Sequence, residues 1–412
     1  MSALTSKEVL RPGARGLKGL MQRAVFAAMP WFFSVLRRVK PIAKLGKSNY
    51  LTSRYDDVRE VFATDTAFGV VYKPKLDVIM GGQPFFLGMA DTPEYRADTD
   101  AMRRVVLPAD LPGLAARVEA LAEEVVAAAR GRIEVVDTLV RRVTFTFLSE
   151  YLGVPEPQEG ALSVWATRLF EFQFADQGND PALRAEVDVI APALRGHVQA
   201  EIERRRTDSQ GDDVLARCLR LQAAGDPWFT DDRIRTALTG FIVGGPPQPP
   251  MVVPQAMEQL LRRPQALAEA QAAARAGDDA RLAAYVMEAM RFDPLAPGLP
   301  RAALRDWTLA AGTPHARTIP AGATVLAAFA SAMMDPRRIA DPRRFDPDRP
   351  ASDYIHFGHG LHECFGRHIN RATLHLMLKP LLKRPGLRRA PGSAGRLRKN
   401  GAFSERLELL FD

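Results

Sequence analysis

Apolar residues recur at helical spacing along most of the chain. Leucine and valine at positions 114, 118, 121 and 125 share one face of residues 113–130, and Gly131 follows them, which predicts a helix. The same pattern predicts helices over residues 57–62, 138–151, 161–174, 183–205, 255–274 and 367–382. Short runs with strand character lie at residues 50–53, 307–310, 317–319 and 323–326. The pattern predicts a mainly α protein with a small β region.

The composition is that of an ordinary globular protein, with 47% hydrophobic and 25% charged residues in a chain of 412. We expect residues 50–412 to form a single domain behind a basic segment, residues 1–49. The two cysteines, Cys218 and Cys364, exclude a disulfide framework. No run of eighteen apolar residues occurs, which argues against a transmembrane helix.

Positive charge is concentrated near the N-terminus. Residues 1–49 hold ten basic residues and one acid, Glu8, whereas the rest of the chain is close to neutral. The neutral body argues against nucleic acid as a partner. Within the basic segment, residues 24–36 are mostly apolar and include Trp31, Phe32 and Phe33. Two interpretations stay open: a helix that caps the fold with solvated charges, or peripheral membrane contact of a cytoplasmic protein through residues 18–40.

The most informative stretch surrounds Cys364. Its sequence is Phe357-Gly358-His359-Gly360-Leu361-His362-Glu363-Cys364-Phe365-Gly366, and a helical pattern follows directly. The glycines allow tight turns and close approach of the backbone, and a cysteine just before a helix N-terminus is favoured as a thiolate.

Three kinds of chemistry fit this cysteine. A zinc site would use the His-rich run of His356, His359 and His362, but the usual second pair of ligands is missing. A nucleophilic cysteine would need separate partners that nothing in the sequence marks. A single thiolate on haem iron also explains the glycines, which give a flat macrocycle room against the loop.

The motif Phe-Gly-x-Gly-x-His-x-Cys-x-Gly resembles the haem-binding signature of the cytochrome P450 family at every fixed position. Glu288 and Arg291 resemble that family's Glu-x-x-Arg pair, whose side chains share one helix face. Arg349 matches the third partner of this buried pair. The three motifs occur in the family's order, and the resemblance extends over nearly the whole chain.

The resemblance implies the cytochrome P450 fold, haem b as cofactor and Cys364 as the axial ligand of the iron. It also implies haem contacts from Phe357, Gly358, Gly360, His362, Gly366, Tyr95, Arg103, Arg104, Arg301 and Tyr354. A ferredoxin or reductase would supply electrons. The basic residues after the cysteine-side helix either dock such a partner or form a solvated face: Lys379, Lys383, Arg384, Arg388 and Arg389.

The chain departs from the family in the central helix that crosses the oxygen side of the haem. Thr230 is the expected N-cap of this helix. Further along, Gly245 takes the family's glycine position, Pro247 replaces its acid and Gln248 its threonine. Five prolines lie between residues 246 and 254, and each interior proline costs about 3 kcal/mol in a regular helix. We therefore predict two half-helices with an irregular segment facing the haem.

The amide side chain of Gln248 cannot relay protons as an acid does. Two functions are compatible with this departure from the family. The protein is an O2-dependent monooxygenase whose protons come from substrate or ordered water, or it acts on a hydroperoxide or peroxide without electron transfer. The aromatic residues expected near the pocket favour a lipophilic small-molecule substrate. The expected pocket residues are Phe85, Phe86, Phe170, Phe172, Phe174 and residues 295–299.

Overall fold

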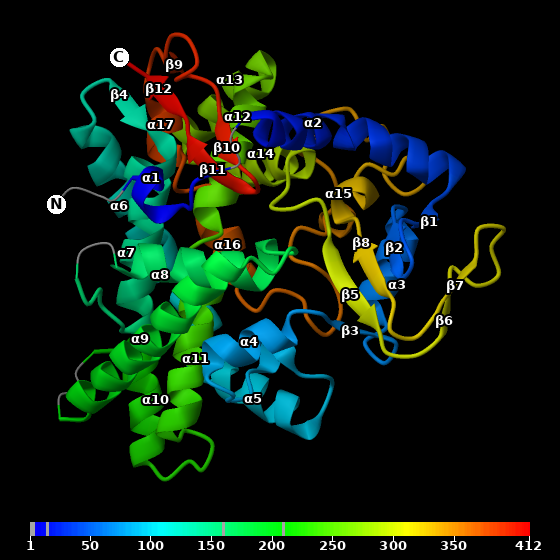
Figure 1. The fold of residues 1–412 in the computed structure, drawn as a ribbon. Coiled ribbons are helices and arrows are strands. Elements are labelled where there is room, and N and C mark those ends of the chain that lie inside the picture. Colours follow the sequence, from blue (N-terminus) through cyan, green and yellow to red (C-terminus); the bar gives the residue numbers. More distant parts are fainter. Residues whose placement is uncertain (1–4, 14–15, 159–160, 208–210) are drawn as a thin grey trace.

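The computed structural model describes residues 5–13, 16–158, 161–207 and 211–412, and most of them are helical (Figure 1). The α-helices are α1 (Ser6–Val9), α2 (Gly16–Val39), α3 (Tyr55–Ala63), α4 (Lys73–Met80), α5 (Pro93–Arg103), α6 (Leu111–Ala128), α7 (Arg142–Leu152), α8 (Ala161–Phe170), α9 (Pro181–Arg206), α10 (Val214–Ala223), α11 (Asp231–Gly244), α12 (Pro249–Leu261), α13 (Pro264–Ala276), α14 (Asp279–Phe292), α15 (Phe329–Ala332), α16 (Arg367–Thr373) and α17 (Lys379–Lys383). Single turns of 3-10 helix are η1 (Phe86–Gly88), η2 (Pro108–Asp110) and η5 (Ala351–Asp353), and π-helical turns are η3 (Val135–Arg141) and η4 (Glu171–Ala175).

The strands form small sheets on the side of the molecule that faces away from α9 and α10, and near the C-terminus (Figure 1). They are β1 (Ile42–Lys44), β2 (Asn49–Thr52), β3 (Phe68–Val70), β4 (Arg132–Glu134), β5 (Leu299–Ala303), β6 (Trp307–Leu309), β7 (Arg317–Ile319), β8 (Thr324–Ala327), β9 (Arg388–Arg389), β10 (Arg398–Asn400), β11 (Phe403–Arg406) and β12 (Glu408–Leu410). The largest sheet has the order β1-β2-β8-β5-β3, and only its β2–β8 pair is parallel. The fold is mainly α with a small β region, as predicted.

Two stretches that were predicted as single helices each form two helices in the structure. Residues 255–274 divide into α12 and α13 at Arg263, whose φ and ψ of −129° and 84° are not helical because Pro264 follows. Residues 367–382 divide into α16 and α17, with turns between them that close on Thr373 and His375. In both places a proline lies at the start of the second helix, where its missing N–H costs nothing.

The basic N-terminal segment shares its structure with the rest of the chain. Its β1 strand pairs with β2, so the predicted division between residues 49 and 50 falls at the first residue of β2, within a hairpin. On α2, Phe33 packs on Leu51 and Ala328, and Arg37 donates to Ser331. Of the helices in the described ranges, none has both the length and the apolar character needed to cross a bilayer.

Two hydrophobic cores support the fold. The larger one fills the space among the helices, and the smaller one joins α3 to the five-stranded sheet. The last turn of α11 lies over the cysteine loop, since Phe241 stacks on Phe365 with ring centroids 5.4 Å apart. The fold therefore brings the predicted helix break and the predicted haem ligand to the same region.

Candidate active site

The loop that carries Cys364 depends on left-handed glycines. Gly358 and Gly360 have φ values of 76° and 74°. A Cβ on Gly360 would lie 2.5 Å from the carbonyl oxygen of Phe62, so only glycine lets the loop approach α3 this closely. The N–H of Cys364 donates to the carbonyl oxygen of Phe357 at 2.8 Å, and Gly366 is the N-cap of α16. The glycine-built loop directly before a helix is thus confirmed.

The protonation of Cys364 differs from the sequence-based expectation. Burial raises the pKa of its thiol to about 11, and the backbone N–H of Gly366 offsets only part of this effect. A helix N-terminus is therefore not enough to favour the thiolate here, because desolvation of the charge outweighs one hydrogen bond. A bound metal cation deprotonates a coordinating thiol, so iron bound at Cys364 would favour its thiolate form.

The histidines around Cys364 have separate partners. His356 donates through Nε2 to the carbonyl oxygen of Met287 at 2.9 Å, and the Nε2 of His359 accepts from Arg59 at 3.1 Å. Among the residues that the structure describes, no three His, Cys, Asp or Glu side chains gather in a metal-binding group. The arrangement does not support the zinc interpretation.

Arg301 is a buried cation. Its side chain is 4% exposed, donates to the carbonyl oxygen of Pro300 at 3.1 Å and lies 4.9 Å from the centre of the Phe62 ring. Within the described ranges, no carboxylate forms an ion pair with it. Burial, together with Arg301, lowers the pKa of His362 to about 4. A buried guanidinium beside a neutral imidazole fits a carboxylate such as a haem propionate.

Tyr95 on α5 reaches the cysteine loop. Its hydroxyl donates to the carbonyl oxygen of Leu361 at 2.6 Å, and its ring centroid lies 6.2 Å from that of His362. The position one turn further along α5 is Thr99, whose hydroxyl donates back to the carbonyl oxygen of Tyr95. The inward face of α5 thus offers hydroxyl groups rather than a cation.

The structure contradicts the haem contacts predicted for Arg103 and Arg104. Arg103 pairs with Asp100 at 3.1 Å with its side chain 68% exposed, and Arg104 pairs with Asp226 at 2.6 Å. Both lie about two turns beyond Tyr95, where the helix directs them toward solvent. Neither is placed to meet a propionate.

Glu288, Arg291 and Arg349 come together as the motif spacing predicts. Arg291 donates twice to Glu288, at 2.6 and 2.8 Å, and both side chains are fully buried. Arg349 approaches Glu288 at 3.4 Å. The hydroxyl of Tyr354 donates to Glu288 at 3.1 Å, so Tyr354 belongs to this ion-pair cluster. That contact replaces the haem contact predicted for Tyr354.

The central helix is broken where its prolines predict. Thr230 is the N-cap of α11, and its hydroxyl accepts from the N–H of Arg233. The helix ends at Gly244, and α12 begins at Pro249. Pro246 and Pro247 have no N–H, so the carbonyl groups four residues before them lose their helical donors. The break therefore leaves backbone carbonyl groups on the last turn of α11 without their helical donors.

Gln248 stabilises the end of α11. Its Nε2 donates to the carbonyl oxygen of Gly244, which has lost its helical partner because the N–H of Gln248 turns to Gly245 instead, at 3.3 Å. The side-chain amide thus acts as a C-terminal cap.

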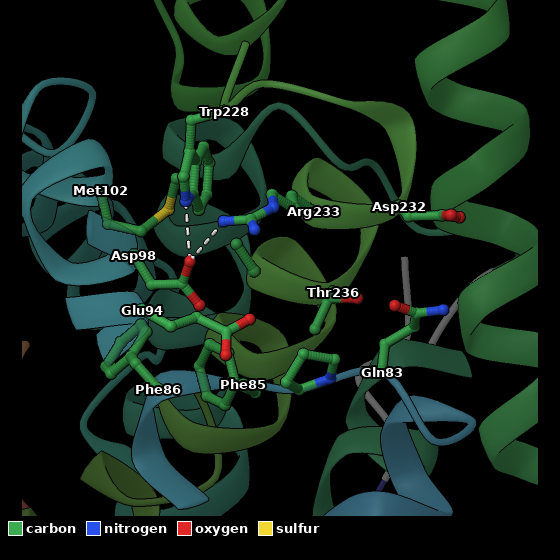
Figure 2. A pocket seen from close by; sticks show the side chains of 12 residues that line it. Gln83, Phe85, Phe86, Glu94, Asp98, Met102, Trp228, Asp232, Arg233 and Thr236 are labelled. Atoms are coloured by element: carbon green, nitrogen blue, oxygen red, sulfur yellow. Dashed lines mark hydrogen bonds and ion pairs between the residues drawn. The ribbon is translucent and has the colours of Figure 1, made fainter. Parts of the chain in front are cut away.

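Phe85 and Phe86, two of the expected pocket residues, line a cavity of about 250 Å³ beside α5 and α11 (Figure 2). On its other wall, Asp98 accepts hydrogen bonds from Trp228 at 2.7 Å and Arg233 at 2.8 Å. Burial raises the pKa of Asp98, and both donors oppose this shift. Sequence reasoning missed this wall because Asp98 is far in sequence from Trp228 and Arg233.

The other expected pocket residues divide into two groups. Phe170 and Phe174 pack together with ring centroids 5.1 Å apart, and Phe174 reaches Tyr72 at 4.9 Å. Leu295 packs against the cluster that contains Phe170. Phe172 instead turns toward the ammonium group of Lys75, which lies 4.9 Å from its ring centre.

Comparison with known proteins agrees with this site. The family model for cytochrome P450 matches residues 185–400. Cyclomarin C epoxidase CymV of Salinispora arenicola is 28% identical over 80% of this chain and 82% of its own length. Cytochrome P450 monooxygenase PikC of Streptomyces venezuelae is 30% identical over 69% and 63%. The ligand-free structure of cytochrome P450 TbtJ1 has a TM-score of 0.79 at 23% identity, over 94% of this chain and 98% of that chain.

The chain belongs to the cytochrome P450 family. Its relatives carry the names of monooxygenases, hydroxylases and epoxidases, so it is an enzyme of the cytochrome P450 monooxygenase type. Its cofactor is haem b, and the fold is the cytochrome P450 fold.

Proposed function

We propose that this enzyme inserts oxygen into a lipophilic small molecule without the family's acid–alcohol pair. The observation that carries the proposal is the break between α11 and α12, where Pro247 and Gln248 stand at the positions of the acid and the alcohol. When bound, haem b supplies the activation of O2 and the oxidation of the substrate. The chain has to hold the substrate and admit protons.

Haem binding in this proposal rests on the cysteine loop. When haem b is bound, Cys364 would be the ligand of its iron, Gly358, Gly360 and Gly366 would leave room for the cofactor, and Phe357 would lie beside them. The close approach of Gly360 to α3 holds this loop in place, and the left-handed turns at Gly358 and Gly360 support the assignment. Arg301, His362 and Tyr95 would hold the propionates. The lack of an acid partner for Arg301 among the described residues supports this role.

Proton delivery passes through water at the helix break. The carbonyl groups of Ile242 and Val243 lack helical donors because residues 246 and 247 are prolines, so they are acceptors for ordered water. Glycine is required at position 245, because a Cβ there would lie 2.9 Å from the carbonyl oxygen of Phe241. Gln248 orders the segment through its bond to Gly244, while its amide cannot supply a proton as an acid.

The substrate is a lipophilic compound that contacts aromatic side chains. Phe85 and Phe86, which line the cavity, and Phe170 and Phe174, which pack in the cluster with Met251, support this assignment. Two relatives are named for the epoxidation of cyclomarin C and the C-12 hydroxylation of erythromycin. By analogy, we infer that oxygen insertion here also takes place on a preformed, bulky organic molecule.

A second candidate is a hydroperoxide-rearranging or peroxide-using P450, which needs no electron partner. The missing acid–alcohol pair favours it. The test incubates the holoenzyme either with NADPH, a ferredoxin, its reductase and O2, or with a lipid hydroperoxide and no reductant. The monooxygenase proposal expects oxygenated product only in the first reaction. Rapid conversion in the second alone would overturn it.

Bacterial relatives of this type take electrons from ferredoxin and reductase partners. The cations proposed to dock them are all engaged with acids: Lys379 and Lys383 with Glu119, Arg384 with Glu123, Arg388 with Asp412 and Arg389 with Glu258. These pairs cancel much of the positive field, so this face does not favour an acidic ferredoxin.

We also infer a cytoplasmic enzyme that rests on anionic membrane through residues 18–40. On α2, Met21, Val25, Phe32 and Val39 are exposed at helical spacing, and Trp31 is 71% exposed. Sedimentation with vesicles that contain phosphatidylglycerol tests this inference. Trp31→Ser should lower the bound fraction, whereas an unchanged fraction, or equal binding to neutral vesicles, would contradict it.

A further inference from the structure

The first described residues, 5–13, form a short segment that we call the N-terminal strap. Its single helical turn, α1, lies beside α8 and β11 (Figure 1). Thr5 and Glu8 form a capping box, with the N–H of Thr5 donating to Glu8 at 2.7 Å. Both the N–H and the hydroxyl of Ser6 donate to the buried Asp137, each at 2.6 Å. The first end of the strap is thus fixed to η3.

The other end of the strap is held by Arg11. Its guanidinium pairs with Asp180 at 2.7 Å and with Glu186 at 3.3 Å, at the start of α9. The side chain of Asn400, at the end of β10, donates to the carbonyl oxygen of Arg11 at 2.7 Å. The strap therefore ties α9 to the β10–β11 hairpin, two elements that are remote in sequence.

Between these anchors, Leu10 points inward. It is 4% exposed and packs in one cluster with Phe170 of α8, Met251 of α12 and Phe403 of β11. Leu295 packs against the same cluster. Met251 lies one turn after Gln248, so this cluster borders the broken helix at the proposed oxygen side.

We propose that the N-terminal strap is an outer wall of the substrate pocket and that Leu10 limits the size of the molecules that enter. The inference rests on the proposed function of the site. A short segment with one helical turn, whose outer end is held by ion pairs near the surface, opens more readily than the helices beneath it. When Arg11 leaves its carboxylates, Leu10 withdraws, and the apolar group of Phe170, Met251 and Phe403 becomes accessible.

The test compares a small and a bulky haem ligand, imidazole and clotrimazole, by stopped-flow absorbance on the holoenzyme. Leu10→Ala and Arg11→Ala should each speed the association of clotrimazole by about tenfold and leave that of imidazole unchanged. Lys7→Ala is the matched control, because Lys7 lies on the same helical turn with an exposed side chain. It should behave as the wild type.

Wild-type association rates for clotrimazole in both variants would overturn the proposal, as would equal acceleration of both ligands. If Leu10→Ala does not fold, Arg11→Ala and Asn400→Ala decide, since their changes lie at the surface end of the strap. The spectrum of the reduced carbon monoxide complex distinguishes failure of the strap proposal from failure of the proposed function. A haem–thiolate spectrum with unchanged rates contradicts the strap alone, whereas loss of that spectrum in the wild type contradicts the site itself.

Discussion

The two sides of the candidate site are built in opposite ways. On the cysteine side, the Glu288–Arg291 pair is fully buried and is joined by Arg349 and Tyr354, so polar contacts determine the backbone around the loop. On the oxygen side, prolines remove hydrogen bonds from the helix, and one glutamine side chain replaces part of what is lost. One side supports the coil before the cysteine loop through redundant contacts, and the other leaves backbone acceptors without helical donors.

This difference explains where the chain tolerates departures from its family. A ligand loop must hold one sulfur atom in place, and a buried charge network is costly to alter. Proton supply requires only a connected path, which water can provide. We therefore expect substitutions on the cysteine side to have large effects on cofactor binding and stability, and substitutions on the oxygen side to have small effects.

The largest effect is expected on the cysteine side. Cys364→Ser should abolish the haem–thiolate spectrum of the reduced carbon monoxide complex, because a hydroxyl is a poor substitute for a thiolate ligand. Cys218→Ala is the control, since Cys218 is buried in α10 away from the loop. A normal spectrum in the Cys364→Ser protein would refute the assignment of the ligand.

The second effect tests the redundancy of the ion-pair cluster. Arg291→Ala leaves Glu288 buried without its main partner and should lower the unfolding free energy by about 3–5 kcal/mol in denaturant titrations. Arg281→Ala, on the same helix, removes an exposed pair with Asp348 and should cost only about 0–1 kcal/mol. Equal losses in the two variants would contradict the special role of the buried pair.

The third prediction concerns acid stability. Burial lowers the pKa of His356 to about 4, below its value in the unfolded chain. The unfolded state therefore binds more protons between pH 6.5 and 4, and stability falls as pH decreases through this window, by up to about 1.4 kcal/mol per pH unit. His356→Gln should flatten the dependence of the melting temperature on pH. The exposed His368, changed to Gln, serves as the control, and an unchanged slope in the His356 variant would refute the prediction.

The smallest effect is expected on the oxygen side. Gln248→Ala removes the cap from Gly244 and should cost about 1 kcal/mol of unfolding free energy. Product formed per NADPH consumed should stay at the wild-type value, because the side chain positions backbone and supplies no proton. A large loss of coupling with unchanged stability would show that Gln248 takes part in proton delivery.

The sequence predicted those parts of the site that depend on one residue and its immediate neighbours. Thr230 as an N-cap, the break at Pro246 and Pro247, and the glycine turns before Cys364 are each fixed by one or two neighbouring residues. The divisions at Pro264 and Pro380 carried the same kind of signal, although the helical periodicity around them obscured it.

Long-range pairing could not be predicted in this way. Arg103 and Arg104 were expected at the haem because of their motif position, yet Asp100 and Asp226 hold them at the surface. Likewise, no neighbour in sequence indicates that Leu10 packs against Phe403. Such contacts depend on the tertiary fold, which a single sequence does not specify residue by residue.

The contact between Phe85 and Gly240 has a consequence for how this enzyme and its relatives diverge. A Cβ on Gly240 would lie 2.3 Å from the Phe85 ring, so the two positions share one volume. A side chain gained on α11 has to be matched by a smaller residue in the loop before α5, and the reverse also holds. Paired substitutions at these two positions can change the shape of the pocket while the total volume of the two side chains stays the same.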